Sequence, residues 1–96
     1  MELFIFARFH ARPGAERAVE EALHKVVTSS REETGCLSIQ AFRSIRDSQL
    51  FYIHSRWSDE VAFDTHAGLP HTVRFIERVE PLVDHALDAQ RCELLA

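Results

Sequence analysis

The stretch from Trp57 to His71 gathers the side chains of this chain that are best suited to chemistry. It opens on an indole and contains two imidazoles, His66 and His71, on either side of a Gly-Leu-Pro break. A neutral imidazole can accept a phenolic proton, and an indole can stack on an aromatic ring. The pattern predicts the rim of a small-molecule pocket, with His66 as proton acceptor and His71 as a second polar contact.

Structural explanations of the same residues stay open at this stage. Trp57 ends an apolar run and would pack under a helix as readily as it would line a pocket. Either histidine would also serve as a surface or helix-capping residue. Phe63 and Phe75, on the helical segments beside the break, are the further apolar walls that a pocket here would need.

The histidines, serines and cysteines form no standard metal-binding or nucleophile motif. The six histidines include no HxH or HExxH pair, and the serines lack a GxSxG context. Cys36 and Cys92 match neither a CxxC pair nor a zinc spacing, and we expect reduced, partly buried thiols. Cys36 also follows a predicted helix end, whose negative dipole disfavours a thiolate. The sequence therefore predicts no metal and no cofactor.

Length and composition indicate one domain spanning residues 1–96. Hydrophobic residues make up 46% of the chain and charged residues 27%, and the net charge of −4 leaves no basic stripe for nucleic acid. The apolar run 3–9 is interrupted by Arg8 and is too short to span a membrane, so we expect a cytoplasmic protein. A chain this short buries a limited core, which favours a homodimer.

The spacing of apolar residues predicts the strands and helices that would position these side chains. Apolar residues alternate in the β-rich runs and recur three or four apart in the helical ones. Ser58 is expected to cap the helix after Trp57, and Gly35 to take a left-handed conformation after the first helix. The expected order is strand 2–10, helix 15–33, strands 36–44 and 49–57, helices 58–67 and 71–79, and strand 84–94.

This β-α-β-β-α-β order is typical of an α+β, ferredoxin-like fold, in which helices cover one face of a four-stranded antiparallel sheet. Phe4, Phe6 and Tyr52 fall on the uncovered face, and a second copy of the sheet is the simplest cover for them. Polar residues of the same parity predict either an anion-binding cluster or a salt-bridged interface inside such a dimer: Arg8, His10, His54 and Arg56.

A series of landmarks runs along nearly the whole chain. They are Arg-Pro-Gly at 12–14, the run REETGCL at 31–37, the strand 51–57 that ends in tryptophan, Ser58-Asp59-Glu60, Phe63, His66, Pro70-His71 and Phe75. In order and spacing these landmarks resemble the antibiotic biosynthesis monooxygenase (ABM) domains. The resemblance implies a dimeric α+β barrel with a ligand between sheet and helices, and oxidation of phenols or quinols by dioxygen without metal or flavin.

The chain departs from the family pattern at several positions. Ser55 stands two residues before the tryptophan, where family members often have an acid, and Ile39 stands where they often have a tyrosine. Related haem-degrading barrels use an asparagine and a further tryptophan where this chain has Ala7 and His66, which disfavours haem degradation. The resemblance therefore predicts a class of reaction and no particular substrate.

The leading hypothesis is a homodimeric, cofactor-independent monooxygenase that acts with dioxygen on a small aromatic, quinol-like compound. Its catalytic residues would be His66 and His71, and Trp57, Phe63 and Phe75 would bind the substrate. The second hypothesis is an isomerase of a small carbonyl metabolite, because the same imidazole would shuttle a proton beside a carbonyl. The third is a non-catalytic dimeric ligand-binding or stress-response module.

Overall fold

The first strand, β1 (Leu3–His10), shows how the alternating sequence determines the sheet. The computed structural model describes residues 1–96, and in it Leu3, Ile5, Ala7 and Phe9 are all buried. The intervening side chains lie on the opposite face, where they are exposed or half-buried. One face of the strand therefore packs against the helices, as its period of two predicts.

Three further strands complete an antiparallel sheet in the order β2-β3-β1-β4. They are β2 (Cys36–Arg43), β3 (Leu50–Trp57) and β4 (Asp88–Cys92). The alternate residues of β3 from Phe51 to Trp57 are buried on the same face as those of β1. The predicted ferredoxin-like α+β fold is confirmed, with β1 and β3 as the central pair.

The last strand is shorter than the predicted 84–94. Before it, Val83 makes an isolated bridge to Ala11, and the Asp84 amide donates to the His10 carbonyl at 3.1 Å. The side chain of His85 is bound to the Arg8 carbonyl at 3.1 Å. These contacts anchor residues 83–85 outside the regular register, so strand pairing with β1 begins only at Asp88.

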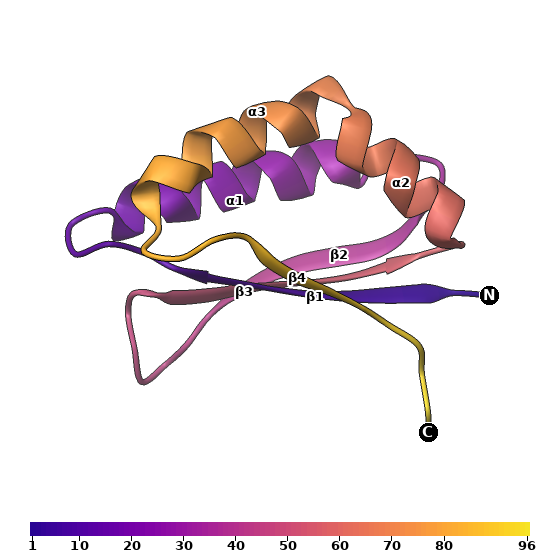
Figure 1. Ribbon diagram of the computed structural model, residues 1–96, viewed down its shortest axis with the longest axis horizontal. Helices are drawn as coiled ribbons and strands as arrows, with labels where there is room; N and C mark the ends of the chain where they lie inside the picture. The colour runs from indigo at the N-terminus through magenta and orange to yellow at the C-terminus, as the bar shows by residue number, and fades with distance from the viewer.

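The helices α1 (Glu16–Ser30), α2 (Glu60–Gly68) and α3 (Pro70–Val79) lie together on one face of the sheet (Figure 1). A short 3-10 turn (Glu80–Leu82) follows α3. The first helix ends before the predicted residue 33, because the amides of Glu32 and Glu33 donate to carbonyls three residues back and tighten the last turn. None of the helices combines the length and apolarity that crossing a bilayer requires.

Gly35 is needed for space, and the prediction of a left-handed conformation at this residue is wrong. Gly14 is the one residue with positive φ, at 89°. A Cβ built on Gly35 would instead lie 2.4 Å from the Cβ of Ala62 in α2. The loop between α1 and β2 thus touches α2 so closely that only glycine fits.

The cap of α2 is Asp59, which corrects the expectation for Ser58. The Asp59 side chain accepts a hydrogen bond from the Ala62 amide at 2.8 Å. The Ser58 amide instead donates to the Gly35 carbonyl at 2.9 Å and so ties the end of β3 to the α1–β2 loop. The first contact starts the helix, and the second holds its start against that loop.

The buried side chains form two groups of unequal size. The larger lies between α1, α3 and the sheet, and it includes the edge-to-face pair Phe9 and Phe75, with ring centroids 5.7 Å apart. The smaller contains Leu3, Ile5 and Trp57, beneath α2. Trp57 therefore belongs to a separate layer of the interior, at the α2 end of the molecule.

The face of the sheet away from the helices is apolar and open, as the strand parity predicts. Phe6 and Tyr52 keep 52% and 39% of their surface exposed, while Phe4 is half-buried beneath the Arg56 guanidinium. The predicted polar group on this face is dispersed within the single chain. Arg56 pairs with Glu2 at 2.5 Å, whereas His10 turns to acids at the far end of the sheet.

The outer strand β2 carries a contact from the end of α1. Arg31 donates from Nε and Nη2 to the Ile39 carbonyl, at 3.3 and 3.0 Å. The register of β2 with β3, together with the Ser44 amide bonded to the Leu50 carbonyl, directs the Ile39 carbonyl away from β3. The guanidinium therefore occupies the open edge of the sheet.

Candidate functional site

A single carboxylate joins the two histidines that the sequence singles out. Oε2 of Glu33 lies 2.8 Å from Nδ1 of His66 and 2.7 Å from Nε2 of His71. We call these three residues the Glu33 cluster. Their side chains are 12%, 10% and 22% exposed, respectively. Carboxylate and imidazoles therefore meet in a largely dehydrated place, where their hydrogen bonds are strong.

Three chain segments converge to build the Glu33 cluster. Glu33 lies in the tight turn after α1, His66 in the last turn of α2, and His71 in the first turn of α3. Leu69 is extended and Pro70 begins α3, a position where its missing N–H is not needed. The break between the two helices thus sets both imidazoles against the same turn.

An aromatic layer closes the cluster on the sheet side. Trp57 is fully buried, and its indole donates from Nε1 to the Ser55 hydroxyl at 2.9 Å. The His66 ring centroid lies 4.4 Å from that of Trp57 and 5.5 Å from that of Phe63. His66 is therefore enclosed by an apolar wall on one side and the Glu33 carboxylate on the other.

Ser55 retains a polar function at this position. It is 2% exposed and accepts the indole N–H, so the chain holds Trp57 in place without the acid that family members often have here. Glu33, in another segment, supplies a carboxylate to His66, whose ring packs on Trp57. The acidic group that is absent at position 55 is therefore present in the same site, on Glu33.

The ionised Glu33 side chain can only accept hydrogen bonds. Each imidazole therefore donates through the ring nitrogen that faces it, Nδ1 in His66 and Nε2 in His71. The Thr72 hydroxyl also lies 3.3 Å from Nδ1 of His66. With Nδ1 occupied in this way, Nε2 is the atom through which a neutral His66 can take a further proton.

Four of the five predicted site residues come together directly, and Phe75 is joined to them only through a cavity that it lines with His71. Trp57, Phe63, His66 and His71 form a continuous set of contacts. Phe75 belongs to the larger core beside Phe9.

The well-defined cavities lie away from the aromatic layer. A cavity of about 360 Å³ between α1 and α3 is lined by both His71 and Phe75. Five surface cavities, of about 350 to 710 Å³, are lined by residues other than Trp57, Phe63 and His66.

Glu33 and Thr72 are the members of the site that the sequence patterns did not reveal. Glu33 is 33 residues from His66 and 38 from His71, so no local spacing connects them. One signal was present, because acidic residues directly after a helix end oppose the helix dipole. Glu33 occupies such a position after α1, which has no basic residue in its last turn.

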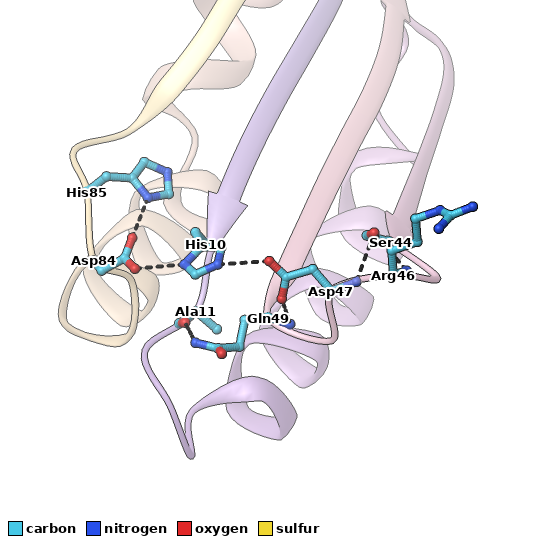
Figure 2. A network of polar contacts seen from close by, with 8 residues as sticks. All are labelled: His10, Ala11, Ser44, Arg46, Asp47, Gln49, Asp84 and His85. Atoms are coloured by element: carbon cyan, nitrogen blue, oxygen red, sulfur yellow. Dashed lines mark hydrogen bonds and ion pairs between the residues drawn. The ribbon is translucent and has the colours of Figure 1, made fainter.

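A second set of imidazoles and carboxylates lies at the opposite end of the sheet (Figure 2). Nδ1 of His10 is 2.7 Å from Asp84, and Nε2 is 3.1 Å from Asp47. His85 is 3.1 Å from the other oxygen of Asp84. We call these four residues the His10 network. It joins the end of β1 to the β2–β3 connection and to the segment before β4.

The pKa values within the His10 network follow from these contacts. Hydrogen bonds to Asp84 and then to Asp47 raise the pKa of His10 above its ordinary value of 6.5. The His85 and His10 contacts lower the pKa of Asp84, and the Gln49 amide is the main cause that lowers the pKa of Asp47. The network therefore favours a charged imidazolium between two carboxylates.

Cys36 has the environment of an unreactive thiol. Burial raises its pKa, and the nearby charge of Glu33 raises it further. The thiol form is therefore favoured at neutral pH, which agrees with the expectation that this cysteine is not a nucleophile.

Comparisons with known proteins agree with this fold. The family model described as antibiotic biosynthesis monooxygenase matches residues 3–78. A relative from Mycobacterium tuberculosis, named "Putative monooxygenase Rv0793", is 32% identical over 79 residues, covering 82% of this chain and 77% of the relative. The solved Rv0793 structure has a TM-score of 0.94 at 26% identity, covering 100% of this chain and 97% of that one.

A second solved structure is PA3566 from Pseudomonas aeruginosa, with a TM-score of 0.91 and 33% identity, covering 99% of this chain and 95% of that chain. The match to the family model includes β1 to α3, and so every residue of the Glu33 cluster and the aromatic layer. Sequence and fold lead to the same assignment: the chain belongs to the antibiotic biosynthesis monooxygenase family.

Proposed function

We propose that the protein is a cofactor-independent monooxygenase that uses dioxygen to oxidise a small aromatic, quinol-like compound. The observation that carries this proposal is the Glu33 cluster packed against Trp57. It places an imidazole that can hold a proton beside an indole that can stack on an aromatic ring. The family to which the chain belongs supports the reaction class.

In the proposed reaction, Nε2 of His66 takes the acidic proton of the substrate, while Glu33 stabilises the imidazolium through Nδ1. The resulting carbanion or phenolate is the electron donor, and it reduces dioxygen to a substrate-bound peroxide. Loss of water from the peroxide gives the carbonyl product. For an anthrone-like methylene the balance is R₂CH₂ + O₂ → R₂C=O + H₂O, so the substrate supplies all four electrons.

His71 takes a positioning role in this proposal. It shares Oε2 of Glu33 with His66 and also lines the cavity of about 360 Å³ between α1 and α3. Its hydrogen bond fixes the carboxylate that orients His66. Phe63 and Trp57 would form the apolar walls beside His66. Phe75 would contact only the part of a substrate that extends into the α1–α3 cavity.

A homodimer is part of the same proposal. Phe6 and Tyr52 stand on the open face of the sheet with 52% and 39% of their surface exposed. A second copy packed on this face would bury the surface that remains exposed, and each of the two side chains would contribute roughly 1 kcal/mol, about half the value for complete burial.

A non-catalytic binding module is the second candidate function, and one observation favours it. Trp57 is fully buried and His66 is 8% exposed, and the well-defined cavities do not reach either residue. An aromatic substrate would reach His66 only if Phe63 and α2 moved away from it. A protein that only holds a ligand in the α1–α3 cavity would not need that movement.

Oxygen uptake measured with a panel of quinols and anthrones tests the proposal. We expect the wild-type protein to consume one dioxygen per methylene oxidised, and the substitution His66→Gln to lower kcat by about 10²- to 10⁴-fold, the range for loss of a general base. His24→Ala is the matched control, because this imidazole is 79% exposed and remote from the cluster.

The possible outcomes separate the candidate functions. Full activity in a folded His66→Gln protein would remove His66 from the mechanism. Saturable ligand binding without oxygen uptake by any compound would favour the binding module. Exchange of a substrate proton with solvent, again without oxygen uptake, would indicate an isomerase, the second hypothesis from the sequence.

A further inference from the structure

We infer that the Glu33 cluster is a binding site for one divalent transition-metal ion. Among the histidines, cysteines and acids of the chain, Glu33, His66 and His71 are the one group of three whose ligand atoms all lie within 4.8 Å of one another. The sequence predicts no metal, because these ligands come from three segments. The inference goes beyond the proposed function, since binding is measured without substrate.

The donor set determines the kind of ion. Two imidazole nitrogens and one carboxylate oxygen are ligands for zinc, iron, cobalt and similar divalent ions, whereas magnesium and calcium prefer oxygen alone. Three protein ligands leave at least one coordination position open for water or another molecule. The site therefore fits an ion of the zinc or iron class with an open coordination position.

The distances allow such an ion after a small movement. Donors bound at about 2.1 Å in tetrahedral geometry are about 3.4 Å apart. The two nitrogen-to-oxygen distances are 2.8 and 2.7 Å, so the Glu33 carboxylate has to withdraw by well under 1 Å, while the two imidazole nitrogens, within 4.8 Å of each other, have to approach by up to about 1.4 Å. Both imidazoles exchange the proton that they now donate to Glu33 for the metal ion, because a ligating nitrogen must offer its lone pair.

The surroundings favour retention of the ion. His66 and Glu33 are 10% and 12% exposed, and Phe63 and Trp57 exclude water from one side. The cavity that His71 lines carries three cations, Lys25, Arg74 and Arg78, against one acid, Glu77; their charge opposes the approach of a divalent cation from that side and attracts anions to an open coordination position. The hydroxyl of Thr72, 3.3 Å from Nδ1 of His66, is one further polar group beside the site.

One consequence does rest on the proposed function. A metal ion and the proton-holding role compete for Nδ1 of His66 and for the Glu33 carboxylate. Under the proposed mechanism, saturating Zn²⁺ therefore inhibits oxygen uptake, and a chelator restores it.

The test is a titration of full-length protein without a histidine tag, first treated with a chelator and then given Co²⁺. Trp57 is the only tryptophan, and its ring centroid is 4.4 Å from that of His66, so paramagnetic Co²⁺ should quench its fluorescence. We expect saturation at one equivalent, cobalt absorption bands of a nitrogen and oxygen site, and displacement by Zn²⁺.

Variants locate the site. His71→Ala and Glu33→Gln should each weaken Co²⁺ binding by at least about 100-fold, since even changes behind the ligands lower affinity by about 10–100-fold. His24→Ala should bind as the wild type does. Circular dichroism establishes that each variant is folded, and Glu33→Gln keeps the test decisive if His71→Ala unfolds.

Two results would overturn the inference. One is the absence of saturable quenching and of cobalt bands in the wild-type protein. The other is binding that remains unchanged in folded Glu33→Gln and His71→Ala proteins. Neither result bears on the proposed oxygenase, which is judged by oxygen uptake in chelator-treated protein, and a lack of oxygen uptake likewise leaves the titration valid.

Discussion

The Glu33 cluster and the His10 network contain the same chemical groups in opposite arrangements. In the first, one buried carboxylate lies between two imidazoles. In the second, one imidazole whose side chain is 25% exposed lies between two carboxylates that are 43% exposed. Two carboxylates stabilise one charged imidazolium. A single carboxylate shared by two imidazoles can balance the positive charge of only one of them. The first arrangement suits proton transfer or metal binding, and the second suits a fixed ionic tie.

The two sets also differ in how they are held. The Glu33 cluster depends on α2 and α3 packing against the α1–β2 loop, with Gly35 against Ala62. The His10 network depends on the end of the sheet, where the last residue of β1 meets the β2–β3 connection and the segment before β4. A change can therefore be directed at one set while the other serves as its control.

The largest effect is expected from Gly35→Ala, which pushes α2 away from the loop. The new Cβ would lie 2.4 Å from that of Ala62, a short side chain that cannot bend aside. We expect a loss of about 3 kcal/mol in the free energy of unfolding, near the upper end for overpacking, measured by urea denaturation. Gly68→Ala is the control, because nothing lies within 4 Å of its Cβ position. Equal stability of the two variants would contradict the close-packing explanation.

Glu33→Gln should have the next largest effect. Both imidazoles bind the same oxygen, Oε2, and an amide oxygen in that place can still accept from both but carries no charge, so two charge-assisted hydrogen bonds become weaker neutral ones in a place with little water. We expect a loss of about 1–2 kcal/mol at pH 7. Asp84→Asn, which replaces a carboxylate that is 43% exposed, should shift the urea midpoint less. A larger midpoint shift for Asp84→Asn than for Glu33→Gln would contradict the view that the more buried carboxylate contributes more to stability.

The pH dependence of stability should come from the His10 network, with a smaller effect. The pKa of His10 is raised above 6.5, so its contribution is complete below about pH 6.5 and is lost as the pH rises through the folded-state pKa. The pKa values of Asp47 and Asp84 are lowered from 3.8, so their contribution is present above that value and is lost as the pH falls through the folded-state pKa values.

The measurement compares thermal midpoints of wild type and His10→Gln from pH 4 to 9. The difference should be greatest between about pH 4 and 6.5 and should shrink at higher pH. A difference that grows as the pH rises from 7 to 9 would contradict the raised pKa of His10.

Salt should give the smallest effect. Raising NaCl from about 0.1 to about 1 M shortens the Debye length from about 10 to about 3 Å and screens exposed charges most. At pH 6 the midpoint difference between wild type and His10→Gln should decrease, and that for Glu33→Gln should stay nearly constant. Equal salt sensitivity would mean that the Glu33 cluster is as hydrated as the His10 network.

The sequence predicted the features that depend on local period. Alternation placed Ile5 and Ile53 on the covered face and Phe6 and Tyr52 on the open one, because a strand has a strict period of two. The helix break at Leu69 was predictable from Gly68 and Pro70, because glycine and proline interrupt helices in most contexts. Element order then followed, and with it the ferredoxin-like fold.

The features that depend on distant partners were not predictable. The carboxylate of Glu33 meets its imidazoles only after the α1–β2 loop packs on α2, and His10 meets Asp84 across 74 residues. Gly35 illustrates the same limit, because its sequence position suggests a helix cap while its actual requirement is Ala62. The predicted cap, Ser58, was one residue too early, because its amide is bonded to the Gly35 carbonyl and the carboxylate of Asp59 caps the helix instead.

The contact of Arg31 with β2 has a consequence for solubility. An outer strand offers open carbonyls and amides to any extended chain, which is how sheets join edge to edge and aggregate. Arg31 occupies the outward carbonyl of Ile39 with two N–H groups and brings a positive charge to the middle of that edge. Another strand could pair with this edge of β2 only by displacing the guanidinium. Arg31 at the end of α1 therefore disfavours edge-to-edge association of the sheet.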